Sequence, residues 1–308
     1  MPQPLRIEDE HTTSLITTRT RGSALWFVRS PKFEERVLAY LAKYQAIYGA
    51  IIYAFVFQGN HYHLVARFPR HNRALFMRDL NSIAARLTKI HIHDYDGGTL
   101  WARRYSEQAL PRDEDIEEYF FYCALQPVKA GLCSRPSAYK SYNSFYDAAD
   151  GVSRRYKVVD WTRFHEKERS NSKLSVKDFT NEYRLTFSRL PGYEGLSQRE
   201  YRQVLLSKLE ERRVKLVSER LEQGLSFLPP ERLRKTVRGS KPFSTKTSTR
   251  HSHRPLVLTC CMETKRAFLQ MYFDVKAAFD FASKLYRKGI FDVDFPRGTY
   301  RPFVLSTG

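Results

Sequence analysis

The sequence predicts an α+β protein: a ferredoxin-like antiparallel sheet with helices on one face, followed by a mainly helical, basic C-terminal region. Three observations predict it. Strand-like and helical patterns follow one another between residues 11 and 112 in the order strand, helix, strand, strand, helix, strand. Past about residue 150 the apolar residues follow helical spacing, and most of the excess positive charge lies there. We therefore divide the chain into a domain at 1–150 and a basic region at 151–308.

The first half of the pattern contains one helix between two strands. The Thr-rich stretch 11–20 is typical of a strand. A helix is expected over 30–49, since Ser-Pro opens it, Val37, Leu38 and Leu41 follow helical spacing, and Gly49 ends it. The apolar run 50–58 then indicates a buried strand.

The second half of the pattern begins with a hairpin. Gly59 and Asn60 form a tight turn, and "HYHLVARF" at 61–68 is the returning strand. A long helix is expected over 72–95, ending at Gly97-Gly98, and a short strand over 106–112. A further helix over 113–126, which Pro127 ends, would pack against the sheet. The C-terminal region is expected to contain long helices over 196–224 and 263–289.

Charge separates the two regions and narrows the class of ligand. Residues 1–150 hold 19 Lys and Arg against 16 Asp and Glu, whereas residues 151–308 hold 33 against 17. The segment 232–254 has eight Lys and Arg and no acid. Such density attracts polyanions and makes binding sensitive to salt. We expect nucleic acid rather than a membrane as the partner, because no basic amphipathic helix stands out. The phosphate-binding candidates in this segment are Arg232, Arg234, Lys235, Arg238 and Lys241.

Composition excludes several other classes. With 42% hydrophobic and 14% aromatic residues, the 308-residue chain is expected to fold around a sizeable core. No apolar run is long enough to span a bilayer, and the first residues lack the apolar region of a signal peptide. The four cysteines form neither a zinc spacing nor a disulfide framework. We expect a cytoplasmic, nucleoid-associated protein.

The chemistry depends on two histidines in one strand. Alternation places His61 and His63 on the same face, close enough to share an ion. In the helix over 113–126, Tyr122 and Gln126 are four residues apart and share a face. A divalent ion held by two imidazoles and an amide oxygen would polarise a phosphate and assist attack by a tyrosine, whose hydroxyl is a weak nucleophile at neutral pH. A pair of surface or core histidines is the simpler alternative.

These residues resemble a family. "NHYHLV" is similar to the His-hydrophobic-His motif of the HUH single-strand nucleases, and "YCALQPVKAGL" resembles the tyrosine segment of IS200-like and REP-associated tyrosine transposases. The resemblance covers roughly residues 10–147. It implies an HUH nuclease domain that cuts single-stranded DNA beside a hairpin, forms a 5′-phosphotyrosine link and frees a 3′-hydroxyl.

Carried over by position, the resemblance implies specific roles. Tyr122 is the nucleophile, and His61, His63 and Gln126 hold Mg²⁺ or Mn²⁺. Gln126 is the IS200-like choice, whereas REP-associated members usually have Asn there. Arg103 and Arg104, after a tryptophan, correspond to a DNA-contacting segment. The protein would act as a monomer or a homodimer.

Other tyrosines, histidines and acids are alternatives to the residues of this set. Tyr119 is the rival nucleophile. His91 and His93 repeat the His-hydrophobic-His pattern near a helix end, where residues two apart diverge by about 200°. His251 and His253 lie in the basic stretch, and the acids at 113–118 are typical of a helix start. The alternative function is a non-catalytic DNA- or RNA-binding regulator on the same sheet.

Overall fold

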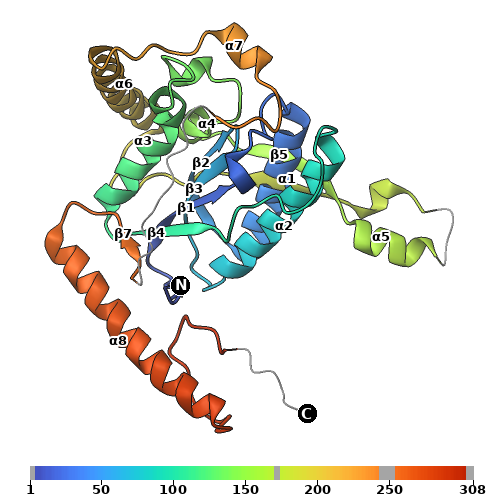
Figure 1. Cartoon of the computed structure of the whole chain (residues 1–308), viewed down its shortest axis with the longest axis vertical. Helices are drawn as coiled ribbons and strands as arrows, with labels where there is room; N and C mark the ends of the chain where they lie inside the picture. The colour runs from blue at the N-terminus through green and yellow to red at the C-terminus, as the bar shows by residue number, and fades with distance from the viewer. Residues whose placement is uncertain (1–3, 170–173, 243–253, 303–308) are drawn as a thin grey trace.

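A mainly antiparallel sheet lies at the centre of the molecule (Figure 1). The structure is a computed structural model that describes residues 4–169, 174–242 and 254–302. In these ranges the sheet has five strands in the order β2-β3-β1-β4-β7. The first four strands therefore have the ferredoxin-like order that the sequence predicts.

The predicted chain order is confirmed element by element. The strands and helices are β1 (Thr13–Arg19), η1 (Arg21–Ser23), α1 (Pro31–Tyr48), β2 (Ile51–Gln58), β3 (His61–Arg67), α2 (Arg73–His91), β4 (Ser106–Leu110) and α3 (Asp113–Lys129). Strand β1 pairs with β3 on one side and β4 on the other, both antiparallel. Gly49 follows α1 in the left-handed conformation, with φ of 64°, which a glycine adopts without strain.

Both faces of the sheet are covered. One apolar cluster joins α1 and α2 to side chains such as Phe55, Tyr62 and Leu64. A second cluster joins α3, α4 (Phe145–Asp150) and α6 (Gln198–Glu222) to the alternate side chains, among them Val56 and Val65. The two ferredoxin-like helices thus lie on one face, and α3 adds a layer on the other. Burial on both sides explains why β2 is an unbroken apolar run.

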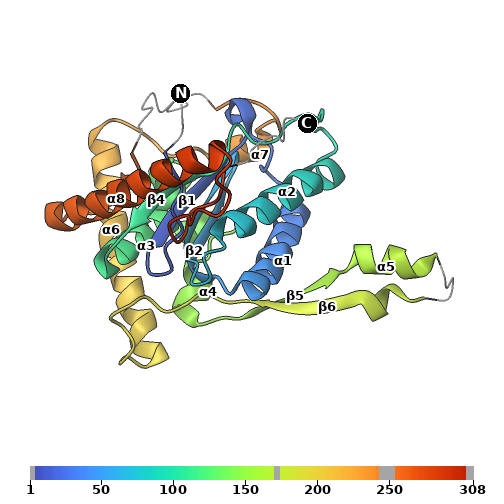
Figure 2. The same cartoon turned by 90° about the horizontal axis from the view of Figure 1, so that it is seen from below.

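The region after residue 150 is partly helical but also contains a hairpin that the sequence does not reveal. The turn η2 (Pro136–Ala138) and helix α4 come just before this region. The region itself contains β5 (Arg154–Val159), α5 (Trp161–Glu168), η3 (Val176–Phe179), β6 (Thr180–Leu185), α6, α7 (Pro230–Lys235), β7 (Leu256–Val257) and α8 (Met262–Arg287). Strands β5 and β6 pair antiparallel and, with α5, form an arm that extends from the body (Figure 2). Strand β5 begins with two exposed arginines and buries only one residue, so it lacks an apolar alternation.

The C-terminal region contributes to the same layers as the first. Strand β7 pairs parallel with β4 at the edge of the sheet, and Tyr201, Leu205 and Leu209 of α6 are buried in the cluster that contains α3. The division at residue 150 stays a prediction. In the described part of the chain, no helix is long and apolar enough to cross a membrane.

Two helix ends differ from the predicted ones. Helix α2 ends at His91 rather than near Gly97, and α3 continues through Pro127 to Lys129. A proline removes one backbone donor, but Pro127 lies in the last turn, and the following turn is still bonded, with Ala130 N donating to Gln126 O at 2.9 Å.

Candidate active site

The two histidines of β3 point toward each other on the sheet face that α3 covers. The Nε2 atoms of His61 and His63 lie 3.2 Å apart. They share this face with Val65, which packs in the α3 cluster, whereas Tyr62 between them packs in the opposite cluster. The alternation predicted from the sequence therefore places two nitrogen ligands side by side.

Each imidazole is held in place by a hydrogen bond at its Nδ1 atom. His63 Nδ1 bonds Thr17 Oγ1 at 2.7 Å, from the residue opposite it in the β1–β3 ladder. His61 Nδ1 bonds Asn60 Oδ1 at 2.6 Å, and Asn60 Nδ2 donates to Ser23 O at 2.8 Å. Such partners fix the orientation of a metal-binding imidazole and leave Nε2 free to coordinate. Sequence reasoning missed Thr17 and treated Asn60 only as a turn residue.

Helix α3 brings Tyr122 and Gln126 to this face. The rings of Tyr122 and His63 have centroids 5.5 Å apart, and the ammonium of Lys129 lies 5.1 Å from the Tyr122 ring centroid. Gln126 is buried, one helical turn after Tyr122. The four predicted chemical residues are thus brought together by β3 and α3.

The donors fit a divalent cation. Two imidazole nitrogens converge, and the buried Gln126 amide has an Nε2 atom with no hydrogen-bond partner among the described residues. Rotation of that amide would present its oxygen in place of the nitrogen. No group of three or more His, Cys, Asp and Glu in the described ranges is suited to hold a metal, but an amide oxygen is a ligand outside that set.

Burial keeps both imidazoles of the site neutral. Burial, then the neighbouring His63 and Arg19, lower the pKa of His61 well below its ordinary value, and burial with Arg19 lowers the pKa of His63 to about 3. Both imidazoles are therefore in the form that binds metals. Burial raises the pKa of the Tyr122 hydroxyl, while Gln126 and Arg19 act in the opposite direction.

Arg19 is the cation of the site, and sequence reasoning missed it. It lies directly opposite His61 in the β1–β3 ladder and is half-buried. Its guanidinium makes no hydrogen bond or ion pair with any residue in the described ranges. An unpartnered cation beside two neutral imidazoles and a tyrosine is suited to an anion.

The competing residues lie in other environments. The ring centroids of Tyr119 and Tyr122 lie 5.4 Å apart. Within the described residues, the Tyr119 ring has no ring contact with either histidine. His91 ends α2, where burial, Arg36 and Lys32 lower its pKa. His251 and His253 lie outside the described residues.

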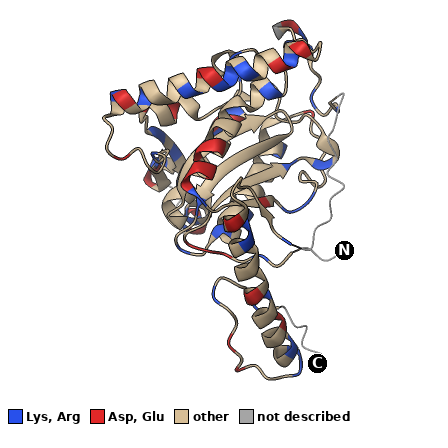
Figure 3. Cartoon of the chain, turned by 90° about the vertical axis from the view of Figure 1, so that its left-hand side faces the viewer, with Lys and Arg blue, Asp and Glu red and all other residues tan. Residues whose placement is uncertain are grey.

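Three of the acids at the start of α3 pair with basic groups on α6 and nearby segments. Glu117 accepts a hydrogen bond from Lys208 at 2.7 Å and also contacts Arg212, while Glu114 pairs with Arg112. Figure 3 shows this acidic start in red, beside the mixed charges of α6. These carboxylates serve helix packing and are not placed with the histidines.

Two segments that contain predicted DNA-contacting residues lie at the end of the sheet that holds His61. Arg103 and Arg104 are exposed and follow Ala102, whose N–H donates to Arg19 O at 3.0 Å. Residues 236–241, which we call the strap, lie against the loop 24–29, with Leu25 N donating to Ser240 O at 2.8 Å. That loop in turn packs on the Gly59 turn, where Phe27 N donates to Gly59 O.

The basic residues of α7 and the strap differ in their exposure and in their contacts with the rest of the protein. Arg232, Arg234, Lys235 and Lys241 are exposed. Arg238 binds the protein itself: its guanidinium donates to Arg29 O at 2.8 Å and lies 3.4 Å from Asp94. Gly239 has φ of 77°, and a Cβ there would lie 2.6 Å from the Trp26 ring, so the strap needs glycine at this point. Residues 243–253 of the basic stretch lie outside the described residues.

Part of the chain is similar to known proteins. A family model described as "Transposase IS200 like" matches residues 16–119, a range that includes both histidines and stops before Tyr122. No curated protein matches the chain. Among solved structures, the chain is similar to a REP-associated tyrosine transposase bound to a REP hairpin. The identity is 19%, the TM-score is 0.37, and the match covers 47% of this chain and 84% of that one.

Proposed function

We propose that this chain is a metal-dependent single-strand DNA endonuclease and strand transferase, because residues 16–119 match a family model described as "Transposase IS200 like". It acts beside hairpin DNA and passes through a 5′-phosphotyrosine at Tyr122. The observation that carries the proposal is the convergence of His61 Nε2 and His63 Nε2, 3.2 Å apart, beneath the helix that holds Tyr122 and Gln126.

The proposed reaction exchanges one phosphodiester for another. The Tyr122 oxygen attacks the scissile phosphorus, a bond forms between that oxygen and phosphorus, and the bond to the 3′-oxygen breaks. The proton of the tyrosine hydroxyl is lost and the departing 3′-oxygen gains one, so no water is consumed. Attack by a 3′-hydroxyl on the tyrosyl phosphate reverses the exchange and joins strands.

His61, His63 and Gln126 would hold Mg²⁺ or Mn²⁺, and the cation would neutralise charge on the scissile phosphate. Thr17 and Asn60 orient the two imidazoles through their Nδ1 atoms. Two nitrogen ligands favour Mn²⁺ over Mg²⁺, which prefers oxygen. We therefore expect activity at lower concentrations of Mn²⁺ than of Mg²⁺.

Arg19 is a protein side chain that would assist the reaction beside the metal. Its unpartnered guanidinium would bind a non-bridging oxygen of the scissile phosphate. Because the same charge lowers the pKa of the Tyr122 hydroxyl, it opposes the effect of burial and favours loss of the tyrosine proton during attack. Arg103, Arg104, Arg232, Arg234, Lys235 and Lys241 would bind flanking phosphates, whereas Arg238 would act by anchoring the strap.

Covalent capture tests this function against a non-catalytic DNA- or RNA-binding regulator. The full-length protein is incubated with a labelled oligonucleotide that contains a hairpin and single-stranded flanks, with Mn²⁺ or with EDTA. We expect a protein–DNA adduct on a denaturing gel in Mn²⁺ and none in EDTA. Binding without any adduct over a library of flank sequences would favour the regulator, and equal adduct in EDTA would contradict the metal role.

A further inference from the structure

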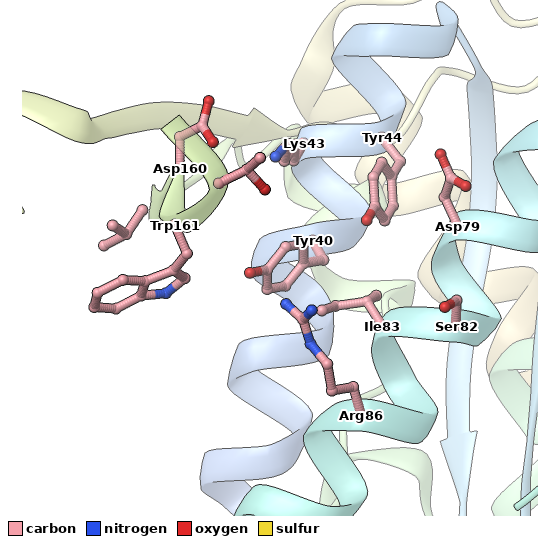
Figure 4. A pocket seen from close by; sticks show the side chains of 11 residues that line it. Tyr40, Lys43, Tyr44, Asp79, Ser82, Ile83, Arg86, Asp160 and Trp161 are labelled. Atoms are coloured by element: carbon pink, nitrogen blue, oxygen red, sulfur yellow. The ribbon is translucent and has the colours of Figure 1, made fainter. Parts of the chain in front are cut away.

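A hollow of about 230 Å³ lies between helices α1 and α2 and the start of the arm (Figure 4). It is on the opposite face of the sheet from His61 and His63, because α1 and α2 cover that face. Tyr40, Lys43 and Tyr44 enter it from α1, Arg86 from α2, and Trp161 from α5. The reaction at Tyr122 uses none of these side chains.

The walls of this pocket are aromatic. The Tyr40 and Tyr44 rings have centroids 6.0 Å apart on the α1 side, and Trp161 lies on the arm side (Figure 4). Trp161 remains 41% exposed although it contacts Phe164 and His165. Its indole N–H donates to no residue in the described ranges. A large aromatic that stays partly exposed at a pocket mouth offers ring surface on which a base can stack.

The pocket also contains two cations. Within the described part of the chain, neither Lys43 nor Arg86 makes a hydrogen bond or an ion pair; the Lys43 ammonium lies 5.9 Å from the Tyr40 ring centroid. The nearby carboxylates are already engaged, since Asp79 accepts from Tyr48 and Arg78, and Asp160 accepts from Arg163 N at 3.1 Å. The pocket therefore places aromatic rings beside two cations, whose charge the carboxylates of Asp79 and Asp160 partly offset.

We propose that this pocket binds one unstacked nucleobase of single-stranded DNA, with the adjoining phosphates on Lys43 and Arg86. Its volume lies below the roughly 300–1,000 Å³ of sites for drug-sized ligands, which suits a single planar ring. Residues 154–185, which include the arm, carry nine Lys and Arg against five Asp and Glu. Aromatic platforms interleaved with cations bind single strands with little sequence preference.

This inference rests on the proposed function only in taking single-stranded DNA as the polymer. A strand gripped here is held on the side of the molecule away from Tyr122. The contact therefore adds to binding without taking part in the chemistry. We expect it to accept any base, since every base offers a flat face to the aromatic rings of the pocket.

Photocrosslinking tests the pocket directly. Full-length protein is bound to an unstructured oligonucleotide that contains 5-iododeoxyuridine, irradiated, digested and mapped by mass spectrometry. We expect crosslinks at Trp161 or Tyr40. In parallel, Trp161→Ala should weaken binding of the same oligonucleotide by about 5- to 150-fold, the range for loss of one stacked base. Trp161→Phe keeps a stacking ring and should bind within about threefold of wild type. Phe281→Ala, an exposed aromatic on α8, is the control and should bind as wild type does.

Charge provides a second readout that does not depend on how α5 folds. Replacing Lys43 and Arg86 with Gln should flatten the dependence of log affinity on log salt by about 0.7 for each phosphate that the variant no longer binds. Wild-type affinity and salt slope in both variants, with crosslinks confined to other segments, would overturn the pocket while leaving adduct formation by Tyr122 intact. Loss of adduct formation with crosslinks still at Trp161 would instead overturn the proposed function and support the pocket.

Discussion

The hydrogen bond between Thr17 and His63 gives the sharpest test of the proposed metal site. Thr17 Oγ1 is the partner of His63 Nδ1 at 2.7 Å, and the His63 side chain is only 5% exposed, so water cannot easily replace it. Thr17→Val keeps the shape of the side chain but leaves Nδ1 unsatisfied. Loss of such a partner lowers metal affinity about 10- to 100-fold, which equals about 1.4–2.7 kcal/mol. Because the site is buried, we expect the upper half of that range.

The assay is calorimetric titration of Mn²⁺ into the full-length protein without DNA. Thr18→Val is the matched control. Thr18 is the next residue of the same strand, but it points to the opposite face and donates to the Tyr62 hydroxyl at 3.3 Å. We expect it to bind Mn²⁺ within about threefold of wild type, since the metal ligands keep their partners. Wild-type affinity in Thr17→Val, or equal losses in both variants, would refute the reasoning.

Three further predictions concern the phosphate, the strap and a buried acid. Arg19→Gln should slow adduct formation in single turnover by about 10²-fold, the usual effect of removing one donor to a developing charge, whereas Arg21→Gln on the exposed neighbouring turn should react at the wild-type rate. The second prediction concerns four exposed basic residues, Arg232, Arg234, Lys235 and Lys241. Neutralising them should reduce the slope of log affinity for the hairpin against log salt by about 0.7–0.9 for each phosphate that is no longer bound. An unchanged slope would mean that these residues only aid solubility. Burial raises the pKa of Glu34 from 4.5 to about 7. The folded state therefore holds a proton that the unfolded state releases. The contribution of this proton to the free energy of unfolding is present below pH 4.5 and is lost as pH rises through 7. Between pH 5 and pH 8 the free energy of unfolding of wild type should therefore fall by about 2.5 kcal/mol relative to Glu34→Gln, measured by urea denaturation, and parallel pH profiles would contradict the role of Glu34.

Most of the central fold could be predicted because its signals are local. Gly49, the Gly59-Asn60 turn and the apolar spacing of α1 each determine structure within a few residues, so the four-strand order followed. The β5–β6 hairpin was missed because its strands are exposed and charged, and β7 because a two-residue strand has no periodicity. The continuation of α3 through Pro127 depends on the backbone bonds of the following turn, which no short motif reveals.

The grouping of the candidate site residues could be predicted in part, while their chemical roles stay predictions. His61, His63, Tyr122 and Gln126 carry spacing signals of period two and period four, and the structure brings them together. Thr17 and Arg19 have no motif, because their position depends on the register of β1 against β3, which pairs Thr17 with His63 and Arg19 with His61. The internal bonds of Arg238 likewise depend on contacts about 210 residues away along the chain.

Identification of the residue that carries the DNA tests the central claim most directly. The adduct formed in Mn²⁺ is digested, and the modified peptide is sequenced by mass spectrometry for wild type, Tyr122→Phe and Tyr119→Phe. The account predicts a phosphotyrosine link at Tyr122 in wild type and in Tyr119→Phe, and no adduct in Tyr122→Phe although that variant still binds the hairpin. An adduct mapped to Tyr119, or one of wild-type yield from Tyr122→Phe, would contradict it.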